Sequence, residues 1–130
     1  MVVDTSALIA ILKDEADAQT LLNWIGQEEE VVIGTPTLFE YLMAAVGRGD
    51  AGQEVTARAL LDQLGVRIVS WTPEHAELAT SAFLRFGKGR HPARLNFGDC
   101  MAYAVAKSLD APLLFKGTDF AATDVRRIGG

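Results

Sequence analysis

Four acidic residues of this 130-residue chain adjoin apolar segments, where a carboxylate is least favourable: Asp4, Glu40, Asp99 and Asp119. Asp4 ends the apolar pair 2–3, and Glu40 interrupts the apolar run 38–43. A charged carboxylate beside a core costs several kcal/mol unless it is paired with a cation or holds a metal. The sequence offers no matching buried cations, so these acids indicate a site that collects divalent cations.

The elements that would position these acids are short strands alternating with helices. We expect strands at residues 2–3, 31–33, 66–69 and 113–115, and a short last strand at 125–128. We expect helices at 5–12 (capped by Thr5 or Ser6), 16–29, 35–46 (capped by Thr35 before Pro36), 52–64, 73–86 (after Thr72) and 98–109, with a loop at 87–95. Short apolar strands bounded by turns favour an α/β fold with a mostly parallel sheet covered on both faces. The length fits a single domain over residues 1–130.

This architecture would bring the four acids toward one edge of the sheet. Asp4 ends the first strand, and Asp119 follows the strand at 113–115. Glu40 and Asp99 lie in the first turns of two helices. Open α/β sheets bind ligands outside the carboxyl ends of their strands. Asp99 reaches that edge only if the loop at 87–95 carries the chain there.

The chemistry that such a cluster favours is metal-assisted cleavage of a phosphodiester bond. Mg²⁺ and Mn²⁺ prefer oxygen ligands and keep several waters. In a two-metal arrangement one ion activates water and the other stabilises the leaving oxygen. The two histidines, His75 and His91, show no metal-ligand spacing.

Each acid also has a structural alternative. Asp4 can cap the helix that follows it, and Asp99 can complement a helix start that is capped by Asn96. Asp119 can cap a turn, and Asp124 is a competing acid five residues later. For Glu40 the alternative is a solvated face, which the apolar residues on both sides of it disfavour. Four such placements at one inferred sheet edge together favour a site.

Charge is distributed unevenly along the chain. The net charge of −5 argues against nonspecific coating of nucleic acid, which is usually done by basic proteins. Residues 78–98 nevertheless contain no Asp or Glu, and they contain Arg85, Lys88, Arg90 and Arg94. We predict that Lys88, Arg90 and Arg94 hold an RNA backbone near the acids. The alternative is a solvated, glycine-rich loop.

Nothing in the sequence predicts a membrane segment or a secretion signal. No apolar stretch reaches the roughly 18 residues of a membrane span, and the N-terminus lacks a basic leader region. Cys100 is the only cysteine, which fits a reducing compartment. We therefore expect a cytoplasmic protein with no membrane partner.

The four acids lie in blocks that together resemble a known family: residues 3–8, 35–40, 96–104 and 113–120. In this order they resemble PIN-domain ribonucleases, and more closely the VapC toxins of bacterial VapBC toxin–antitoxin systems. The resemblance spans nearly the whole chain. The stretch 87–91 also resembles one VapC subgroup.

The resemblance implies an α/β/α sandwich around a mostly parallel five-stranded sheet and a Mg²⁺- or Mn²⁺-dependent endoribonuclease. The implied metal ligands are Asp4, Asp99 and Asp119, with Ser6 and Thr118 as supporting hydroxyls. Glu40 would orient a metal-bound water or ligate a second ion. Asp119 is favoured over Asp124 as the fourth acid because it is nearer the strand end.

The resemblance also implies partners: an RNA substrate, a second copy of the chain in a homodimer, and a VapB-type antitoxin in a hetero-oligomer. The antitoxin would wrap the first helices and push a basic side chain toward the acids. Two apolar faces are candidates for its groove, or for the core: Leu8, Ile9 and Leu12, and Leu38 with Leu42.

Two competing functions remain open on the sequence. A phosphotransfer domain also uses aspartates at strand ends with Mg²⁺, but a HAD-like enzyme needs Asp-x-Asp, and Ser6 stands two residues after Asp4. A receiver domain needs a phosphoacceptor aspartate that is absent from 66–72. The other alternative is a module that binds RNA or antitoxin without cleavage, which the four intact acids disfavour.

Overall fold

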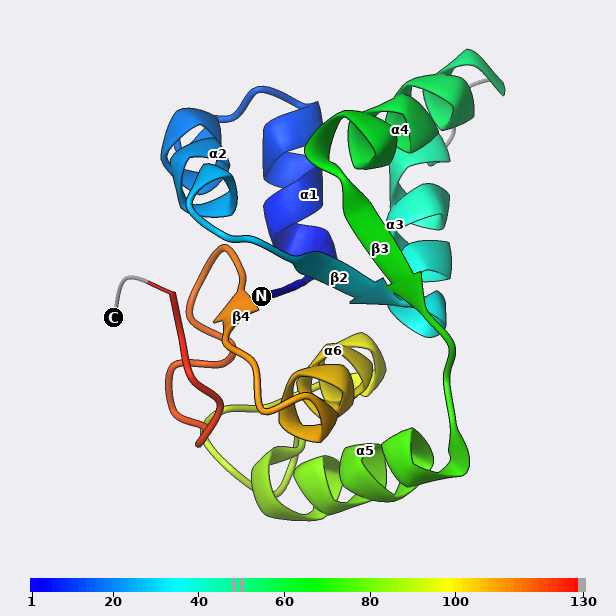
Figure 1. Cartoon of the computed structure of the whole chain (residues 1–130). Helices are drawn as coiled ribbons and strands as arrows, with labels where there is room; N and C mark the ends of the chain where they lie inside the picture. The colour runs from blue at the N-terminus through cyan, green and yellow to red at the C-terminus, as the bar shows by residue number, and fades with distance from the viewer. Residues whose placement is uncertain (48, 50, 129–130) are drawn as a thin grey trace.

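The computed structural model describes residues 1–47, 49 and 51–128, in which strands alternate with helices. The strands are β1 (Val2–Val3), β2 (Val31–Gly34), β3 (Val66–Val69) and β4 (Leu113–Leu114). The helices are α1 (Thr5–Leu12), α2 (Ala18–Gly26), α3 (Thr35–Val46), α4 (Ala51–Leu64), α5 (Pro73–Phe86) and α6 (Phe97–Ser108). The sheet lies between α1–α4 on one side and α5 and α6 on the other (Figure 1). The predicted α/β/α sandwich is confirmed.

The strand pairings in the described part of the chain are all parallel, in the order β3-β2-β1-β4. Val2 of β1 pairs with Val32 of β2 on one side and with Leu113 of β4 on the other. Because the strands are parallel, their carboxyl ends meet at one edge of the sheet. That edge receives the start of α1, the start of α3 and the segment after β4.

Neighbouring strand residues point to opposite faces of the sheet and so build two cores. One core contains Val3 and Ile33 and packs against α1 to α4. The other contains Val2, Val32 and Leu113 and packs against α5 and α6. Both faces are therefore covered at β1, β2 and β4, whose residues are all buried, whereas the edge strand β3 carries the exposed Arg67.

The described residues contain four strands, so the prediction of five is wrong in this count. The expected strand at 125–128 forms one isolated parallel bridge, between Leu113 and Arg127. Leu113 N–H donates to Arg126 O at 2.8 Å. Arg126 and Arg127 are both exposed. Two adjacent exposed arginines break the apolar pattern that a longer buried strand needs.

The N-caps of two helices differ from expectation. The N-cap of α1 is Asp4, not Thr5 or Ser6, and its carboxylate accepts a hydrogen bond from Ser6 N–H. The N-cap of α3 is Gly34 rather than Thr35. The extended backbone of Asp4 (φ −91°, ψ 156°) lets its short carboxylate reach back to the free N–H groups of α1. The alternative in which Asp4 caps a helix is therefore correct.

Other boundaries follow the sequence more closely. The start of α5 is capped by Thr72, as expected, in a reciprocal box with His75. The helix expected at 16–29 is shorter and spans Ala18–Gly26. Leu8 is fully buried in the first core, whereas the other apolar residues of the two candidate groove faces are only partly buried against it. Within the described residues, no helix combines the length and apolar character needed to cross a membrane.

Candidate active site

Asp4 lies at the carboxyl end of β1 with 5% of its surface exposed. Its Oδ2 accepts hydrogen bonds from Ser6 N–H at 3.1 Å and from the Ser6 hydroxyl at 2.6 Å. The same hydroxyl accepts a hydrogen bond from Lys116 N–H at 2.9 Å. Ser6 therefore orients Asp4 and ties the start of α1 to the segment after β4.

Glu40 reaches from α3 to two other elements. The Thr5 hydroxyl at the start of α1 donates to Glu40 Oε1 at 2.5 Å. The carboxylate also lies against Gly98 in the first turn of α6, where an added Cβ would be 2.8 Å from Glu40 Cδ. Glu40 thus brings its charge to the point where α1, α3 and α6 meet.

Asp99 lies in the first turn of α6 and is 9% exposed. Asp99 N–H donates to Asn96 Oδ1 at 2.9 Å, and Asn96 N–H donates to Asp99 Oδ2 at 3.0 Å. This reciprocal capping box confirms the structural alternative for Asp99. No described residue donates a hydrogen bond to Asp99 Oδ1, which leaves that oxygen available to a ligand.

The four acids share one electrostatic environment. Burial raises the pKa of Asp99 to about 6, a backbone hydrogen bond opposes the shift, and the negative charges of the other three acids add to it. Burial also raises the pKa of Asp4, hydrogen bonds oppose it, and the charge of Glu40 adds to it. Like charges held this close destabilise one another, so a cation in their midst would be stabilised.

No cation among the described residues neutralises these acids. Within residues 1–47, 49 and 51–128, none of the four takes part in an ion pair. Lys116 follows β4, but its ammonium pairs with Glu15 and, at 3.4 Å, with Asp17.

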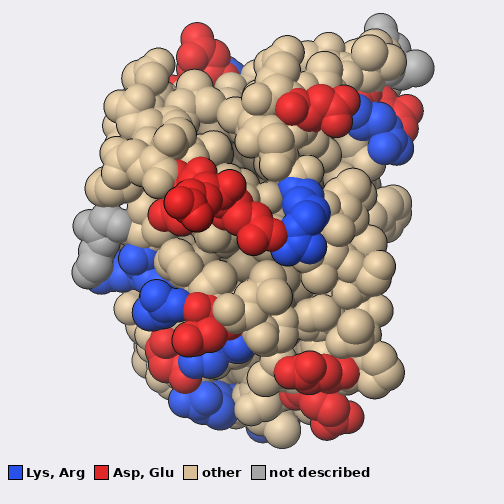
Figure 2. Space-filling view, in the orientation of Figure 1, with Lys and Arg blue, Asp and Glu red and all other residues tan. Residues whose placement is uncertain are grey.

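Elsewhere on the molecule, acidic side chains do form ion pairs with cations. Figure 2 shows acidic side chains gathered along the connection from α2 to β2, against a basic side chain over β3, where Glu30 pairs with Arg67.

Asp119 lies on the rim of a hollow of about 420 Å³. The hollow is lined by Lys88, Pro92, Ala93, Arg94, Asn96, Thr118 and Asp119. Asp119 is exposed, yet its charge acts on Asp99. Thr118 lines the same hollow, and its side chain makes no hydrogen bond to a described residue. The hollow therefore joins the acidic cluster to the basic loop.

The three predicted RNA-binding cations separate into two groups. Lys88 and Arg94 line the hollow beside Asp119. Arg94 has a positive φ of 56°, an uncommon backbone state for a residue with a side chain. The guanidinium of Arg90 instead lies over the Phe83 ring, 5.4 Å from its centroid. The structure thus brings two of the three cations beside one of the four acids, Asp119.

Asp124 belongs to a different cluster. Its Oδ1 accepts a hydrogen bond from the Tyr103 hydroxyl at 2.5 Å, and its Oδ2 lies 3.3 Å from Lys107 Nζ and 3.4 Å from Arg85 Nη1. Burial raises the pKa of Asp124, but the hydrogen bonds from Tyr103 and Lys107 and the nearby cations outweigh it, so the pKa is lowered. Asp124 is a paired carboxylate.

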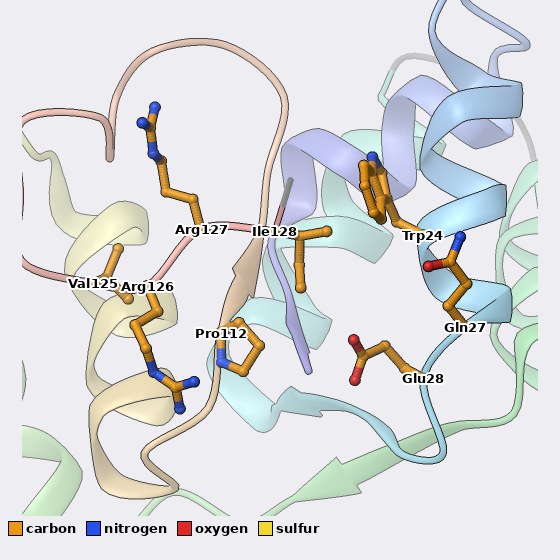
Figure 3. Close-up of a pocket in the computed structure, with 8 residues that line it drawn as sticks. All are labelled: Trp24, Gln27, Glu28, Pro112, Val125, Arg126, Arg127 and Ile128. Carbon is orange, nitrogen blue, oxygen red and sulfur yellow. The ribbon is translucent and has the colours of Figure 1, made fainter. Parts of the chain in front are cut away.

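A second hollow, of about 550 Å³, lies away from the four acids. Figure 3 shows Trp24, Gln27 and Glu28 on one side of it, and Pro112 with residues 125–128 on the other. None of the four acids lines it. Pro112 precedes β4 and Glu28 precedes β2, so this hollow belongs to the amino-terminal edge of the sheet.

Two residues of the acidic site escaped the sequence argument: Thr5 and Gly98. Gly98 left a weak signal, since a glycine inside a helical pattern costs stability relative to alanine. Thr5 left none, because a threonine beside a helix start is an ordinary cap candidate. Its bond to Glu40 spans 35 residues of sequence.

A family model for the PIN domain matches residues 1–126 of the chain. The parallel sheet and the acids at its carboxyl edge agree with that match. The chain belongs to the PIN domain family.

Similar proteins within this family are VapC ribonucleases, which confirms the resemblance seen in the sequence. The chain is 40% identical over 126 residues to ribonuclease VapC36 of Mycobacterium tuberculosis, covering 96% of this chain and 91% of that protein. It is 41% identical over 132 residues to ribonuclease VapC of Mycolicibacterium smegmatis, covering 98% and 99%.

Solved structures confirm the fold. VapC20 of Mycobacterium tuberculosis, described as a sarcin-ricin loop cleaving toxin, matches with a TM-score of 0.77 at 23% identity, covering 98% of this chain and 97% of that one. A chain from a toxin-antitoxin complex of Klebsiella pneumoniae matches with a TM-score of 0.73 at 21% identity, covering 95% and 92%.

Proposed function

We propose that this protein is a Mg²⁺- or Mn²⁺-dependent endoribonuclease toxin of the VapC kind. The observation that carries the proposal is the buried Asp99 carboxylate, on which the charges of Asp4, Glu40 and Asp119 act, in a cluster that no described cation neutralises. It lies at the edge of a parallel sheet where α/β proteins bind their ligands. The names of the VapC relatives support RNA as the substrate.

The donor set fits a hydrated divalent cation. Among residues 1–47, 49 and 51–128, no three His, Cys, Asp or Glu side chains form a ready metal-binding group. Mg²⁺ does not need one, because it is usually held through one or two carboxylates and keeps several waters. In our proposal Asp4 and Asp99 are the main ligands and Asp119 completes the site. Bound there, the cation would supply an activated water and charge stabilisation at the phosphate.

The chain's own residues would orient the attacking water and bind the RNA. Glu40 would accept a hydrogen bond from the attacking water, while Ser6 keeps Asp4 oriented. Lys88 and Arg94, which line the hollow beside Asp119, would hold the RNA backbone. Lys88 and Arg94 line the same hollow as Asp119, and neither forms an ion pair with a described residue, which supports this role.

We further propose a VapB-type antitoxin and a second copy of the chain as partners, in the cytoplasm. Toxin–antitoxin assemblies among the matching structures support this. Phe39 and Met43 on α3 and Phe97 at the start of α6 are large exposed apolar side chains, and Phe97 is 83% exposed. Apolar side chains that form a contiguous exposed patch favour a protein partner, so we propose these three as candidates for its contact surface.

The experiment that tests the proposal is cleavage of total cellular RNA by the purified, antitoxin-free protein. It is run with and without Mg²⁺ or Mn²⁺, beside the Asp99→Asn variant. We expect discrete, metal-dependent fragments that fall by roughly 100-fold or more in the variant, since a direct ligand should matter more than a residue behind it. Absence of cleavage by folded protein would instead support a module that binds RNA or antitoxin without cutting.

A further inference from the structure

We infer that Thr5 and Gly98 are positioning residues that together fix the Glu40 carboxylate beside Asp99. The inference rests on the proposed nuclease function and adds to it two residues with no acidic or basic group. Thr5 acts through a hydrogen bond, and Gly98 acts through the absence of a side chain.

Thr5 and Gly98 together form a clamp on the Glu40 carboxylate, and the first part of this clamp is the Thr5 hydroxyl. It donates to Glu40 Oε1 at 2.5 Å, a short bond of the kind made to a charged acceptor. Thr5 directly follows Asp4, the N-cap of α1. The same turn that orients Asp4 through Ser6 therefore orients Glu40 through Thr5.

The second part is the bare backbone of Gly98. A Cβ at this position would overlap Glu40 Oε2 and would lie 2.8 Å from Glu40 Cδ and 3.1 Å from Oε1. The three nearest atoms that this Cβ would meet all belong to the end of that one side chain. Gly98 also lacks a positive φ, so its backbone does not require glycine. The structure thus gives Gly98 one evident reason to be glycine, the close approach of Glu40.

Glu40 needs such a clamp because of its neighbour. Gly98 immediately precedes Asp99, so the space that a methyl group would fill holds the Glu40 carboxylate beside a second acid. A glutamate has three rotatable side-chain bonds and would swing away from a like charge if nothing held it. The clamp therefore keeps the carboxylates close enough to act on one hydrated cation.

Gly98→Ala provides the sharpest test, because its expected effects on stability and on the site have opposite signs. Alanine favours a helix over glycine, and the atoms it meets are the movable end of Glu40. We expect a thermal midpoint no lower than the parent's, with RNA cleavage reduced roughly 10- to 100-fold, as expected for a displaced catalytic group. Mn²⁺ affinity, measured by electron paramagnetic resonance on the full chain without RNA, should weaken severalfold.

Thr5→Val and Thr5→Ser form a matched pair that does not depend on Gly98. Valine keeps the shape but removes the donor, whereas serine keeps the donor. We expect Thr5→Val to lose roughly tenfold in cleavage and severalfold in Mn²⁺ affinity, and Thr5→Ser to restore both to near the parent level. A purely structural role for Thr5 would predict equal losses tracking the thermal midpoint.

Failure of this inference is distinguishable from failure of the proposed function. If the parent cleaves RNA and Asp99→Asn does not, but Gly98→Ala and Thr5→Val both match the parent in cleavage and Mn²⁺ affinity, the clamp is overturned alone. If the parent does not cleave RNA, the nuclease proposal fails. The Mn²⁺ affinities of the variants then still decide whether Thr5 and Gly98 position Glu40.

Discussion

Asp119 and Asp124 lie five residues apart in the sequence and in opposite electrostatic surroundings. Asp119 stands at a hollow where it adds to the charge of three other acids, and no described cation pairs with it. Asp124 lies between Lys107 and Arg85 and accepts a hydrogen bond from Tyr103. The charge of Asp119 disfavours the charged form of Asp99. Asp124 is instead stabilised by the hydroxyl and the cations around it.

The difference separates acids that serve a ligand from acids that serve the fold. A group of unpaired carboxylates lowers the stability of the fold. A chain that keeps such a group therefore has a use for it other than stability, such as binding a ligand. A carboxylate satisfied by protein cations has no capacity left for a metal. By this criterion the choice between Asp119 and Asp124 as the fourth acid favours Asp119.

The largest expected difference between Asp119 and Asp124 is in the RNA cleavage by their variants. We expect Asp119→Asn to reduce metal-dependent RNA cleavage by roughly tenfold or more, because it removes one charge from the proposed metal site. Asp124→Asn should leave cleavage within about twofold of the parent at a temperature where both are folded. The measurement is initial cleavage rate at saturating Mn²⁺. The reverse ranking would make Asp124 the fourth acid.

A smaller contrast should divide the basic loop. We expect Lys88→Ala and Arg94→Ala each to weaken RNA binding severalfold and to lower the dependence of log affinity on log salt by about 1, as for one lost phosphate contact. Arg90→Ala, whose side chain lies over Phe83 away from the hollow, is the matched control. Binding is measured by fluorescence anisotropy over a salt series, with Asp99→Asn protein so that the RNA stays intact. Equal effects from all three variants would argue for a solvated charged loop.

The sequence predicted the fold well because its strands are short apolar runs between clear helix signals. Thr72 before Pro73 marked the start of α5 correctly. The error at 125–128 has a physical cause, since the exposed Arg126 and Arg127 interrupt the apolar pattern and the segment makes one isolated bridge to Leu113 instead of a strand pairing. The sequence of one segment does not determine how many strands will pair with it in the sheet.

The candidate site was predicted in part, for a reason that the contacts make clear. Acids next to apolar runs are visible one at a time, so Asp4 and Asp99 could be singled out. The bond from Thr5 to Glu40 and the close approach of Glu40 to Gly98 join segments 35 and 58 residues apart. Such contacts form only once the strands have taken their places in the sheet, so no local sequence pattern predicts them.

The smallest expected effect is on stability, and it applies to Asp124. Its pKa is lowered in the folded state, so its carboxylate stabilises the fold above the ordinary value of 3.8, and this contribution is lost as the pH falls through the lowered pKa. Asp124 is partly exposed, so solvent screens its ion pairs. We therefore expect Asp124→Asn to cost about 0.5–1 kcal/mol at pH 7.

The pH dependence gives this prediction its control. The difference in unfolding free energy between Asp124→Asn and the parent should be full at pH 7 and should shrink toward zero in acid, where the parent carboxylate is itself protonated. Asp62→Asn, at an exposed α4 position without an ion pair in the described part of the chain, should show little difference at either pH. Urea unfolding at both pH values measures these differences. A gap that persists unchanged in acid would mean that Asp124 stabilises the fold through packing or neutral hydrogen bonds, and the contrast with Asp119 would then not be one of charge.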